Sequence, residues 1–308
     1  MGSRAYFVVN PRSANGRTGK AWPEIKELAQ RAFGEIEAGF TERRWHACEL
    51  ARAALKAGHE LIVSVGGDGT NNEVVNGFFE GGKPVNPEAV FAVVCSGTGS
   101  DLIKTLQIPR DFRESVPMLP GLAAKPTDVG RMTLRDHSGR DVSRYFINIA
   151  SFGVGGEVDE RVNRTSKALG GKASFLWASF WGSLAYKNKA VTFRVDGGEP
   201  FERKIFLAAA SNGQYFGAGM RVAPDAAVDD GLLDFAVLGD FSFFEQFKLM
   251  STIYKGGHLG LPKVEIQRAR RVEATSSERV LLDVDGEQPG TLPATFEVLP
   301  CALRVKRP

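Results

Sequence analysis

The pattern of apolar and polar positions changes character near residue 126. Before it, short apolar runs at 5–9, 60–65 and 89–95 alternate with stretches at 22–33 and 45–57, in which apolar residues recur every three or four positions. The short runs are typical of buried strands, and the spaced ones of amphipathic helices. Strands that alternate with helices need crossover connections, so this pattern predicts a parallel α/β sheet over the first 125 residues or so.

Beyond Pro126 the pattern becomes short alternating segments separated by turn residues, which is typical of antiparallel sheets. The predicted strands cover residues 145–149, 190–195, 204–210, 232–238, 264–269, 271–275, 280–284 and 295–298. Apolar stretches at 175–186 and 241–254 are long enough to be helices. We therefore expect an α/β domain over residues 1–126 and a β-rich domain over residues 127–299. A last strand at 302–305 fits either domain, so residues 300–308 could return to the first.

Composition and charge narrow the class of protein. The chain has 308 residues, 43% hydrophobic and 24% charged, which is typical of a folded globular protein. Lysine and arginine total 39 against 36 acidic residues, an excess too small to indicate a nucleic-acid partner and sufficient only for a weak preference for anionic surfaces. Three widely spaced cysteines indicate neither disulfides nor zinc. No signal peptide is apparent, and no apolar run approaches the roughly 20 residues of a membrane helix. We expect a cytoplasmic protein that meets a membrane peripherally.

The sharpest motif is the sequence GGDGT at residues 66–70, which follows an apolar strand and opens a helical stretch. Its glycines let main-chain amides approach an anion, and a helix amino terminus adds partial positive charge, so a phosphate group fits there. Asp68 is a poor ligand for an anion but suits a metal ion or a reacting hydroxyl. The alternative is an ordinary strand-to-helix turn in which Thr70 or Asn71 is the N-cap.

Two further loops of small polar residues follow predicted strands. NPRSANG at 10–16 follows the first strand and SGTGSD at 96–101 follows the third. Because parallel strands end at one edge of the sheet, we expect these loops to meet GGDGT there, where open α/β sheets bind ligands.

With these loops, later motifs make the chain resemble the diacylglycerol kinase catalytic family, the soluble lipid kinases that include bacterial diacylglycerol kinases, sphingosine kinases and ceramide kinases. The later motifs are NG at 212–213, GAGMRVAPDA at 217–226, DDGLLD at 229–234 and DGE at 285–287. GGDGT alone is shared with NAD kinases and phosphofructokinases, and the later motifs separate this family from them. The chain departs from the family pattern at Ala14, where a glycine is usual, and at Ser96 and Ser100.

The resemblance implies an N-terminal Rossmann-like (phosphofructokinase-like) parallel α/β domain and a C-terminal antiparallel β-sandwich domain. It also implies that ATP gives its γ-phosphoryl group to a lipid hydroxyl in a cleft between them. Carried over by motif, the nucleotide-binding residues are Asn10, Pro11, Arg12, Ser13, Thr41, Gly66, Gly67, Asp68, Gly69, Thr70, Asn71, Asn72 and Thr98.

The resemblance further implies two magnesium sites and a general base. Asp68, Asp101 and Asp128 would organise a catalytic Mg²⁺ through water, and Asp225, the carbonyl of Val228 and Asp230 would hold a structural one. Glu287 corresponds to the general base, with Asp285 beside it, and Asp68 is the other candidate for that role. These roles suit the chemistry, because a lipid alcohol is a poor nucleophile that gains from a carboxylate base and a bound cation. From the residues alone, Asp285-Gly286 indicates a plain β-turn and residues 225–230 a solvated acidic loop.

The sequence therefore predicts an ATP- and Mg²⁺-dependent kinase that acts on a lipid with a free hydroxyl, of the diacylglycerol, sphingoid-base or ceramide type. The alternatives are a soluble-substrate kinase like NAD kinase and a non-catalytic lipid-binding module on the same fold. We expect peripheral contact with the inner face of an anionic membrane and no nucleic-acid partner, and the sequence leaves open whether the chain forms a homodimer. Phenylalanine is abundant, 21 of 308 residues. Its clusters at 175–181 and 241–247 fit either core packing or an acyl-chain site.

Overall fold

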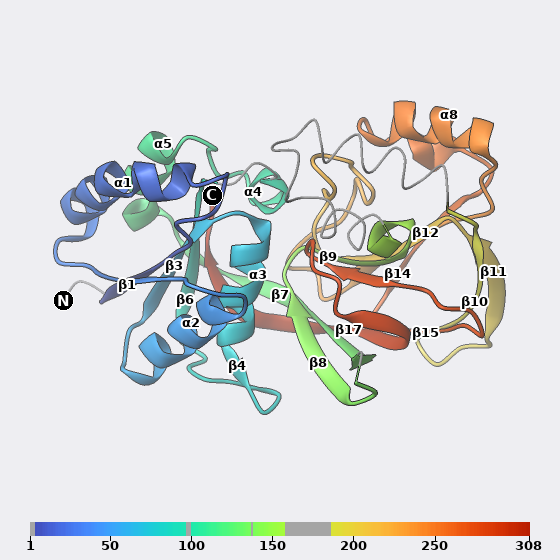
Figure 1. Ribbon diagram of the computed structural model, residues 1–308, viewed down its shortest axis with the longest axis horizontal. Helices are drawn as coiled ribbons and strands as arrows, with labels where there is room; N and C mark the ends of the chain where they lie inside the picture. The colour runs from blue at the N-terminus through green and yellow to red at the C-terminus, as the bar shows by residue number, and fades with distance from the viewer. Residues whose placement is uncertain (1–3, 97–99, 137, 158–185) are drawn as a thin grey trace. The chain divides into compact units, whose positions relative to one another are not determined.

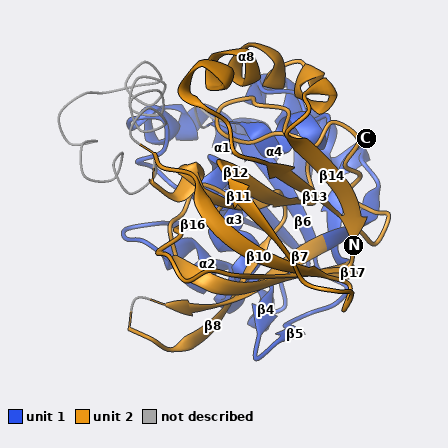
Figure 2. Ribbon diagram, turned by 90° about the vertical axis from the view of Figure 1, so that its right-hand side faces the viewer, with its two compact units in different colours: residues 1–128, 301–308 blue, residues 129–300 orange. Residues whose placement is uncertain are grey.

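The computed structural model describes residues 4–96, 100–136, 138–157 and 186–308. The chain divides into two compact units, coloured in Figure 2. Unit 1 comprises residues 1–128 and 301–308, and unit 2 comprises residues 129–300. Two strands, β7 (Ala124–Asp136) and β17 (Gly290–Lys306), contribute residues to both units, so the end of the chain belongs with its beginning.

Unit 1 contains a parallel sheet with the strand order β2-β1-β3-β6-β17. Its strands are β1 (Ala5–Val9), β2 (Glu37–Phe40), β3 (Leu61–Gly66) and β6 (Val90–Cys95), followed by the end of β17, where Arg304 pairs with Val90. Phe7, Val63 and Ala92 face one side, where they pack against Ile25 and Val116. Because side chains alternate along a strand, the neighbouring residues face the other side.

Helices cover both faces of this sheet, as Figure 1 shows. On one face lie α1 (Arg17–Phe33) and α5 (Phe112–Met118), and on the other lie α2 (His46–Lys56) and α3 (Asp68–Gly77). The remaining elements of unit 1 are the short hairpin β4 (Phe79–Glu80) and β5 (Lys83–Pro84), the short helix α4 (Asp101–Thr105) and a 3₁₀ turn at Leu119–Gly121. The doubly covered parallel sheet explains why its strands appear in the sequence as nearly continuous apolar runs.

Unit 2 is a sandwich of two antiparallel sheets. One contains β11 (Phe201–Ile205), β10 (Lys189–Val195), β15 (Arg271–Thr275) and β17 in that order, with β8 (Asp141–Phe146) paired to β7. The other has the order β14 (Val264–Ala269), β13 (Leu233–Leu238), β12 (Leu207–Ser211), β9 (Ile149–Gly153) and β16 (Leu282–Val284). Both sheets contribute to the core, in which Phe152 stacks on Phe296 at 5.4 Å and lies 6.0 Å from Phe193.

The five-stranded sheet of unit 2 has a second apolar face, which is covered by α8 (Phe243–Ile253). Leu249 and Ile253 of the helix pack with Phe206, Leu207 and Ala236. A 3₁₀ turn at Gly257–Gly260 follows the helix. The predicted fold class is confirmed: unit 1 is a parallel α/β unit and unit 2 an antiparallel β-sandwich. Among the helices that are described, none combines the length and the apolar character needed to cross a bilayer.

Some predicted elements have different bounds. The predicted strand 145–149 spans the end of β8 and the start of β9, and 204–210 spans β11 and β12. The two strands predicted at 295–298 and 302–305 are parts of one long strand, β17. α1 begins at Arg17 rather than Trp22, because its first turn is polar and gives no apolar periodicity. The helix predicted at 175–186 lies, apart from Tyr186, outside the described residues.

Candidate active site

The glycine-rich loop joins β3 to α3 in unit 1. Gly67 is the N-cap of α3 and no side chain caps it. Thr70 and Asn71 have other roles: Asn10 Nδ2 donates to Thr70 Oγ1 (3.0 Å), and Ser64 Oγ donates to Asn71 Oδ1 (2.7 Å). The alternative in which one of them is the N-cap is therefore wrong, because both side chains are bonded to neighbouring strands and loops.

Gly66 is required by the packing of this loop. A Cβ atom at this position would lie 2.5 Å from Thr70 Oγ1, too close for any side chain. The absent side chain lets Thr70 pack directly against the loop, and the partly exposed residues 67–69 follow at the amino terminus of α3, where partial positive charge suits an anion such as phosphate.

The loops that follow β1, β2, β3 and β6 are bonded to one another at a single edge of the sheet. The main-chain N–H of Thr41 donates to Val9 O (2.8 Å), that of Asn10 to Val65 O (3.0 Å), and that of Ser96 to Gly66 O (3.0 Å). Thr18 Oγ1 also donates to Ser96 Oγ (2.9 Å). The structure thus brings together the residues assigned to the nucleotide from these loops, with the exception of Thr98, which lies outside the described residues.

The loop at 10–16 is tightly wound. Asn10 Oδ1 accepts from the main-chain N–H of Arg12 (3.1 Å), and Gly16 N donates to Arg12 O (3.2 Å). Ala14 and Asn15 have φ values of 53° and 57°, and Gly16 has 83°. Ala14, where the family usually has glycine, therefore occupies the left-handed region that costs an alanine energy.

Asp68 holds the amino terminus of α4. Its Oδ2 accepts from Asp101 N (3.2 Å) and its Oδ1 from Leu102 N (3.3 Å). Removal from solvent, and then the neighbouring Asp101 carboxylate, raise the pKa of Asp68, while the main-chain donors oppose this shift. Asp101 is buried and accepts from Lys104 Nζ (2.8 Å). Two carboxylates with one lysine form an anionic site that suits a hard cation.

Asp128 ends the first segment of unit 1 and is fully buried in β7. Its Oδ1 accepts a hydrogen bond from the main-chain N–H of Cys301 (2.7 Å), where the chain has φ 52°. This bond holds β17 at Cys301, where its main chain has positive φ. Across the described ranges no three His, Cys, Asp or Glu side chains form a group able to hold a metal ion. The assignment of Asp128 to magnesium stays a prediction.

The DGE motif of unit 2 forms a two-residue hairpin turn. Val284 and Glu287 exchange main-chain hydrogen bonds (2.8 and 3.0 Å), and Asp285 and Gly286 have φ values of 48° and 88°. Such a turn needs positive φ at both central positions, which is why Asp-Gly occurs there. The plain β-turn and the motif are thus the same feature, and the turn presents the partly exposed side chain of Glu287.

Two aspartates hold this turn in place. Asp285 Oδ1 accepts from Ile149 N in β9 (2.9 Å), and Asp285 N donates to Ile149 O (3.0 Å). Asp283, which is buried, accepts from Ser151 Oγ (3.2 Å) and from Gly286 N (2.9 Å). Asp285 therefore positions the turn that carries Glu287.

The acidic turn at 225–230 is likewise in unit 2. Asp225 and Asp230 are exposed and Asp234 is buried. Burial raises the pKa of Asp234, Arg268 opposes the shift, and Asp230 and Asp225 add to it, so the three carboxylates lie within electrostatic range of one another. Arg268 lies 3.5 Å from Asp230 Oδ2. The two exposed carboxylates and the nearby Val228 carbonyl are a donor set that suits a hard cation.

Sequence reasoning missed several residues that shape these sites. Glu73 accepts from the main-chain N–H groups of Trp45 (2.8 Å) and Ala47 (3.1 Å) at the start of α2. Its signal in the sequence was its place three residues after the GGDGT motif, in the helical stretch that the motif opens. Asp283 was also missed; it lies in β16, two residues before the turn residue Asp285.

Comparison with known proteins identifies both parts of the chain. Residues 4–132 match the diacylglycerol kinase catalytic domain, and residues 148–307 match the YegS C-terminal NAD kinase beta sandwich-like domain. A parallel α/β unit with a glycine-rich loop, followed by this sandwich, defines a kinase of two units.

Curated relatives then give the family. The chain is 30% identical to the diacylglycerol kinase of Staphylococcus carnosus, over 96% of this chain and 92% of the relative. It is equally similar, at 30%, to that of Staphylococcus haemolyticus, over 95% of this chain and 84% of the relative. The chain belongs to the diacylglycerol kinase catalytic family, which confirms the resemblance found in its motifs.

Solved structures agree on the fold. The crystal structure of a diacylglycerol kinase from Bacillus anthracis strain Sterne has a TM-score of 0.77 at 21% identity, with 99% of this chain and 97% of that chain covered. A yeast NADH kinase complexed with NADH has a TM-score of 0.54 at 11% identity, over 99% of this chain and 83% of that chain. The likeness to the NADH kinase is one of fold alone.

Proposed function

We propose that this kinase transfers the γ-phosphoryl group of ATP to the free hydroxyl of a diacylglycerol-type lipid, with Mg²⁺. The observation that carries the proposal is the pair Asp68 and Asp101 beside the glycine-rich loop. An anion site formed by main-chain amides and a pair of carboxylates are the two parts that a magnesium-bound triphosphate requires.

The loops of unit 1 would bind the nucleotide. Gly66, Gly67 and Gly69 expose main-chain amides to the phosphates, while Asn10 keeps the loop after β1 fixed to Thr70 (3.0 Å). Binding to a preformed loop limits the entropy lost when ATP is ordered, so this rigidity favours affinity.

Asp68 and Asp101 would hold Mg²⁺ through water, with Asp128 as a more distant contributor. The fit rests on the charge of the site, since the neighbouring carboxylate raises the pKa of Asp68, and a cation would relieve that repulsion. Bound there, Mg²⁺ would neutralise charge on the phosphate oxygens as the phosphoryl group is transferred. Lys104 already compensates part of the charge of Asp101 at 2.8 Å.

Glu287 would accept the proton of the lipid hydroxyl as the oxygen attacks phosphorus. Its place on a turn held by Asp283 and Asp285 keeps the carboxylate in one position, which a general base needs. The acidic turn with Asp225, Val228 and Asp230 would hold a second, structural cation. Because the lipid acceptor resides in a bilayer, the enzyme would act at the cytoplasmic surface of a membrane.

A substrate panel tests the proposal. Purified protein is incubated with labelled ATP and Mg²⁺ and, separately, with diacylglycerol, phosphatidylglycerol, a sphingoid base and ceramide in detergent micelles, or with NAD in solution. We expect label in phosphatidic acid, no transfer without Mg²⁺, and none with Asp68→Asn. Transfer to NAD alone would assign the chain to soluble-substrate kinases, and ATP consumption that no lipid stimulates would refute lipid phosphorylation.

A further inference from the structure

α8 has two apolar sides. One faces the sandwich, where Leu249 and Ile253 are buried. The other carries Phe243, Phe244 and Phe247, whose exposed fractions are 43%, 82% and 49%. The rings of Phe243 and Phe244 contact each other at 5.4 Å, and those of Phe243 and Phe247 at 5.2 Å. Most other phenylalanines of unit 2 are packed in its hydrophobic core. These three therefore form a separate, outward-facing cluster.

The charges left uncompensated beside this cluster are positive. Lys248 and Lys255 are exposed, and neither forms an ion pair with any residue the structure describes. Lys248 follows Phe244 by four residues and therefore lies on the same side of the helix. Lys255 lies in the turn that follows α8. Glu245 is the one acidic residue of α8, and its carboxylate is already bonded to Lys263 Nζ (2.7 Å).

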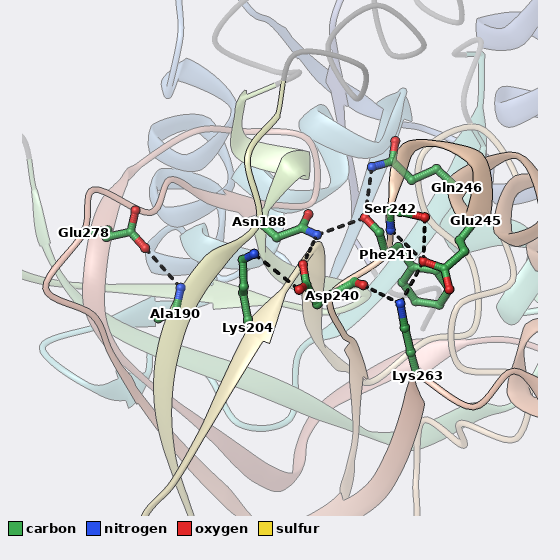
Figure 3. Close-up of polar contacts among 10 residues, drawn as sticks. All are labelled: Asn188, Ala190, Lys204, Asp240, Phe241, Ser242, Glu245, Gln246, Lys263 and Glu278. Atoms are coloured by element: carbon green, nitrogen blue, oxygen red, sulfur yellow. Dashed lines mark hydrogen bonds and ion pairs between the residues drawn. The ribbon is translucent and has the colours of Figure 1, made fainter.

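Polar contacts anchor the start of α8, as Figure 3 shows. Glu245 Oε2 accepts from Ser242 N (2.8 Å) and Ser242 Oγ (2.7 Å) in a capping box. Asp240 accepts from Asn188 Nδ2 (2.6 Å) and Lys204 Nζ (3.3 Å). The helix is therefore held firmly by its polar end, and its exposed rings do not result from a loosely attached segment.

A pocket of about 440 Å³ opens beside this end of α8. Phe243 lines it together with the cationic residues Lys187, Lys189 and Lys204 and the acidic residues Asp240 and Glu278. Lys189 and Lys204 are paired with these acids. Lys187 is exposed, and within the described part of the chain it has no ion-pair partner. The pocket therefore adds a third uncompensated cation next to the aromatic cluster.

We propose that the outer face of α8, with Phe243, Phe244, Phe247 and Lys248, docks onto an anionic lipid bilayer together with Lys255 of the turn that follows. The inference rests on the proposed function, which requires the enzyme to reach a lipid. An amphipathic helix of this composition lies in the membrane interface, with its rings among the acyl chains and its lysines extended toward the headgroups. Anionic headgroups would neutralise the lysines. A symmetric contact with a second copy would instead bring the same lysines together.

Vesicle flotation tests this surface with the full chain. The vesicles contain phosphatidylcholine with or without about one-third phosphatidylglycerol. Basic segments bind the anionic vesicles more strongly than the neutral ones. We expect wild-type protein to float with the anionic vesicles. Phe244→Ser with Phe247→Ser should lower the partition coefficient at least tenfold, and Lys248→Glu with Lys255→Glu should lower it by a similar factor at low salt. Ile266→Ser and Lys83→Glu, at exposed positions outside α8, are matched controls that should stay within twofold.

A micelle assay separates this proposal from the proposed function. Every variant should phosphorylate diacylglycerol in detergent micelles at the wild-type rate, because the substitutions leave the candidate active site intact. Wild-type protein that floats but phosphorylates no lipid would refute the proposed function and leave the surface supported. Unchanged flotation of the phenylalanine variant would overturn the proposed membrane surface. The same conclusion would follow if light scattering showed that the wild type is a dimer and the variant a monomer, while both floated equally well.

Discussion

The carboxylate of Asp68, at the start of α3, accepts a hydrogen bond from the main-chain N–H of Asp101 (3.2 Å), at the start of α4. The same contact places two carboxylates close enough for Asp101 to raise the pKa of Asp68. Asp68 therefore orders the second helix through its hydrogen bonds while its charge opposes that of its neighbour. Unfavourable electrostatics of this kind is typical of functional sites that gain a cation with the substrate.

Asp68→Asn should abolish turnover and stabilise the free protein at neutral pH. The asparagine amide can still accept a main-chain hydrogen bond. The substitution removes a carboxylate charge that is desolvated and repelled by Asp101. We expect kcat to fall at least 10³-fold, within the range for a lost electrostatic or acid–base group. The free energy of unfolding from urea titration at pH 7 should exceed that of the wild type. A variant that is active, or less stable at every pH, would refute this account.

The pH dependence of that stability follows from the raised pKa of Asp68. The folded protein keeps its proton at pH values where an unfolded aspartate, with a pKa of about 4, has lost it. Wild-type stability should therefore fall as the pH rises through this interval, so the advantage of Asp68→Asn grows as the pH rises above about 4. Asp136→Asn is a control of opposite sign. Hydrogen bonds from Ser138, followed by those from Arg140, lower the pKa of Asp136. Replacing this carboxylate should therefore lower the free energy of unfolding mainly above about pH 4.

The sequence predicted the strands best where their apolar residues form uninterrupted runs between turn residues. β1, β14 and β15 have their predicted bounds. β7 gave no strand signal, because Pro126 and Gly130 interrupt it, although one of its partners is the next strand, β8; the other, β17, is distant in the sequence. β17 was divided in two at Pro300, although Asp128 holds the chain at Cys301 and lets the strand continue. Contacts between residues far apart in the sequence decide such cases, and local patterns do not report them.

Like the fold, the candidate site could be predicted from the sequence only in part. The convergence of the loops after β1 and β3 followed from the parallel sheet, since strand ends share an edge. The positioning role of Asp285 could not be predicted, because it depends on the pairing of β16 with β9, in which Asp283 lies opposite Ser151, 132 residues earlier in the chain. The sequence also did not decide whether Phe244 is exposed, since three phenylalanines in an apolar helix fit a buried core as well as an exposed surface.

Ala14→Gly should stabilise the protein. Ala14 has φ 53°, a left-handed conformation that costs an alanine roughly 1–2 kcal/mol and a glycine little, offset by the greater freedom of glycine in the unfolded chain. We expect a net gain of about 0.5–1 kcal/mol in the free energy of unfolding. Ala53→Gly, at an exposed position inside α2, is the matched control and should lose about 1 kcal/mol. Equal losses at both positions would contradict the strain at Ala14.

Magnesium should raise the melting temperature through the acidic turn of unit 2. A cation bound only by the folded state at 100 times its dissociation constant contributes about 2.7 kcal/mol, or about 5–10 °C for a unit of this size. Asp230→Asn should abolish the shift while its side chain still accepts from Leu232 N, as Asp230 does at 3.0 Å. Asp229→Asn, in the same turn but outside the proposed donor set, should keep it. A shift that survives Asp230→Asn places the ion elsewhere.

Glu287→Gln and Asp285→Asn separate a base from a positioning residue. Glutamine cannot take a proton, so kcat of Glu287→Gln should fall 10²–10⁴-fold with an unchanged melting temperature. Asparagine at 285 tolerates the positive φ of 48° and can still accept from Ile149 N, so Asp285→Asn should lose less than tenfold.

Asp285→Ala completes the comparison, because it removes the acceptor of a partly buried N–H and places alanine at positive φ. Together these effects should cost about 2–4 kcal/mol of stability, and activity should fall as the turn loses its position. Wild-type kcat for Glu287→Gln would exclude Glu287 as the base and leave Asp68 as the candidate. A loss for Asp285→Asn as large as that for Glu287→Gln would instead show that the charge of Asp285 takes part in the reaction.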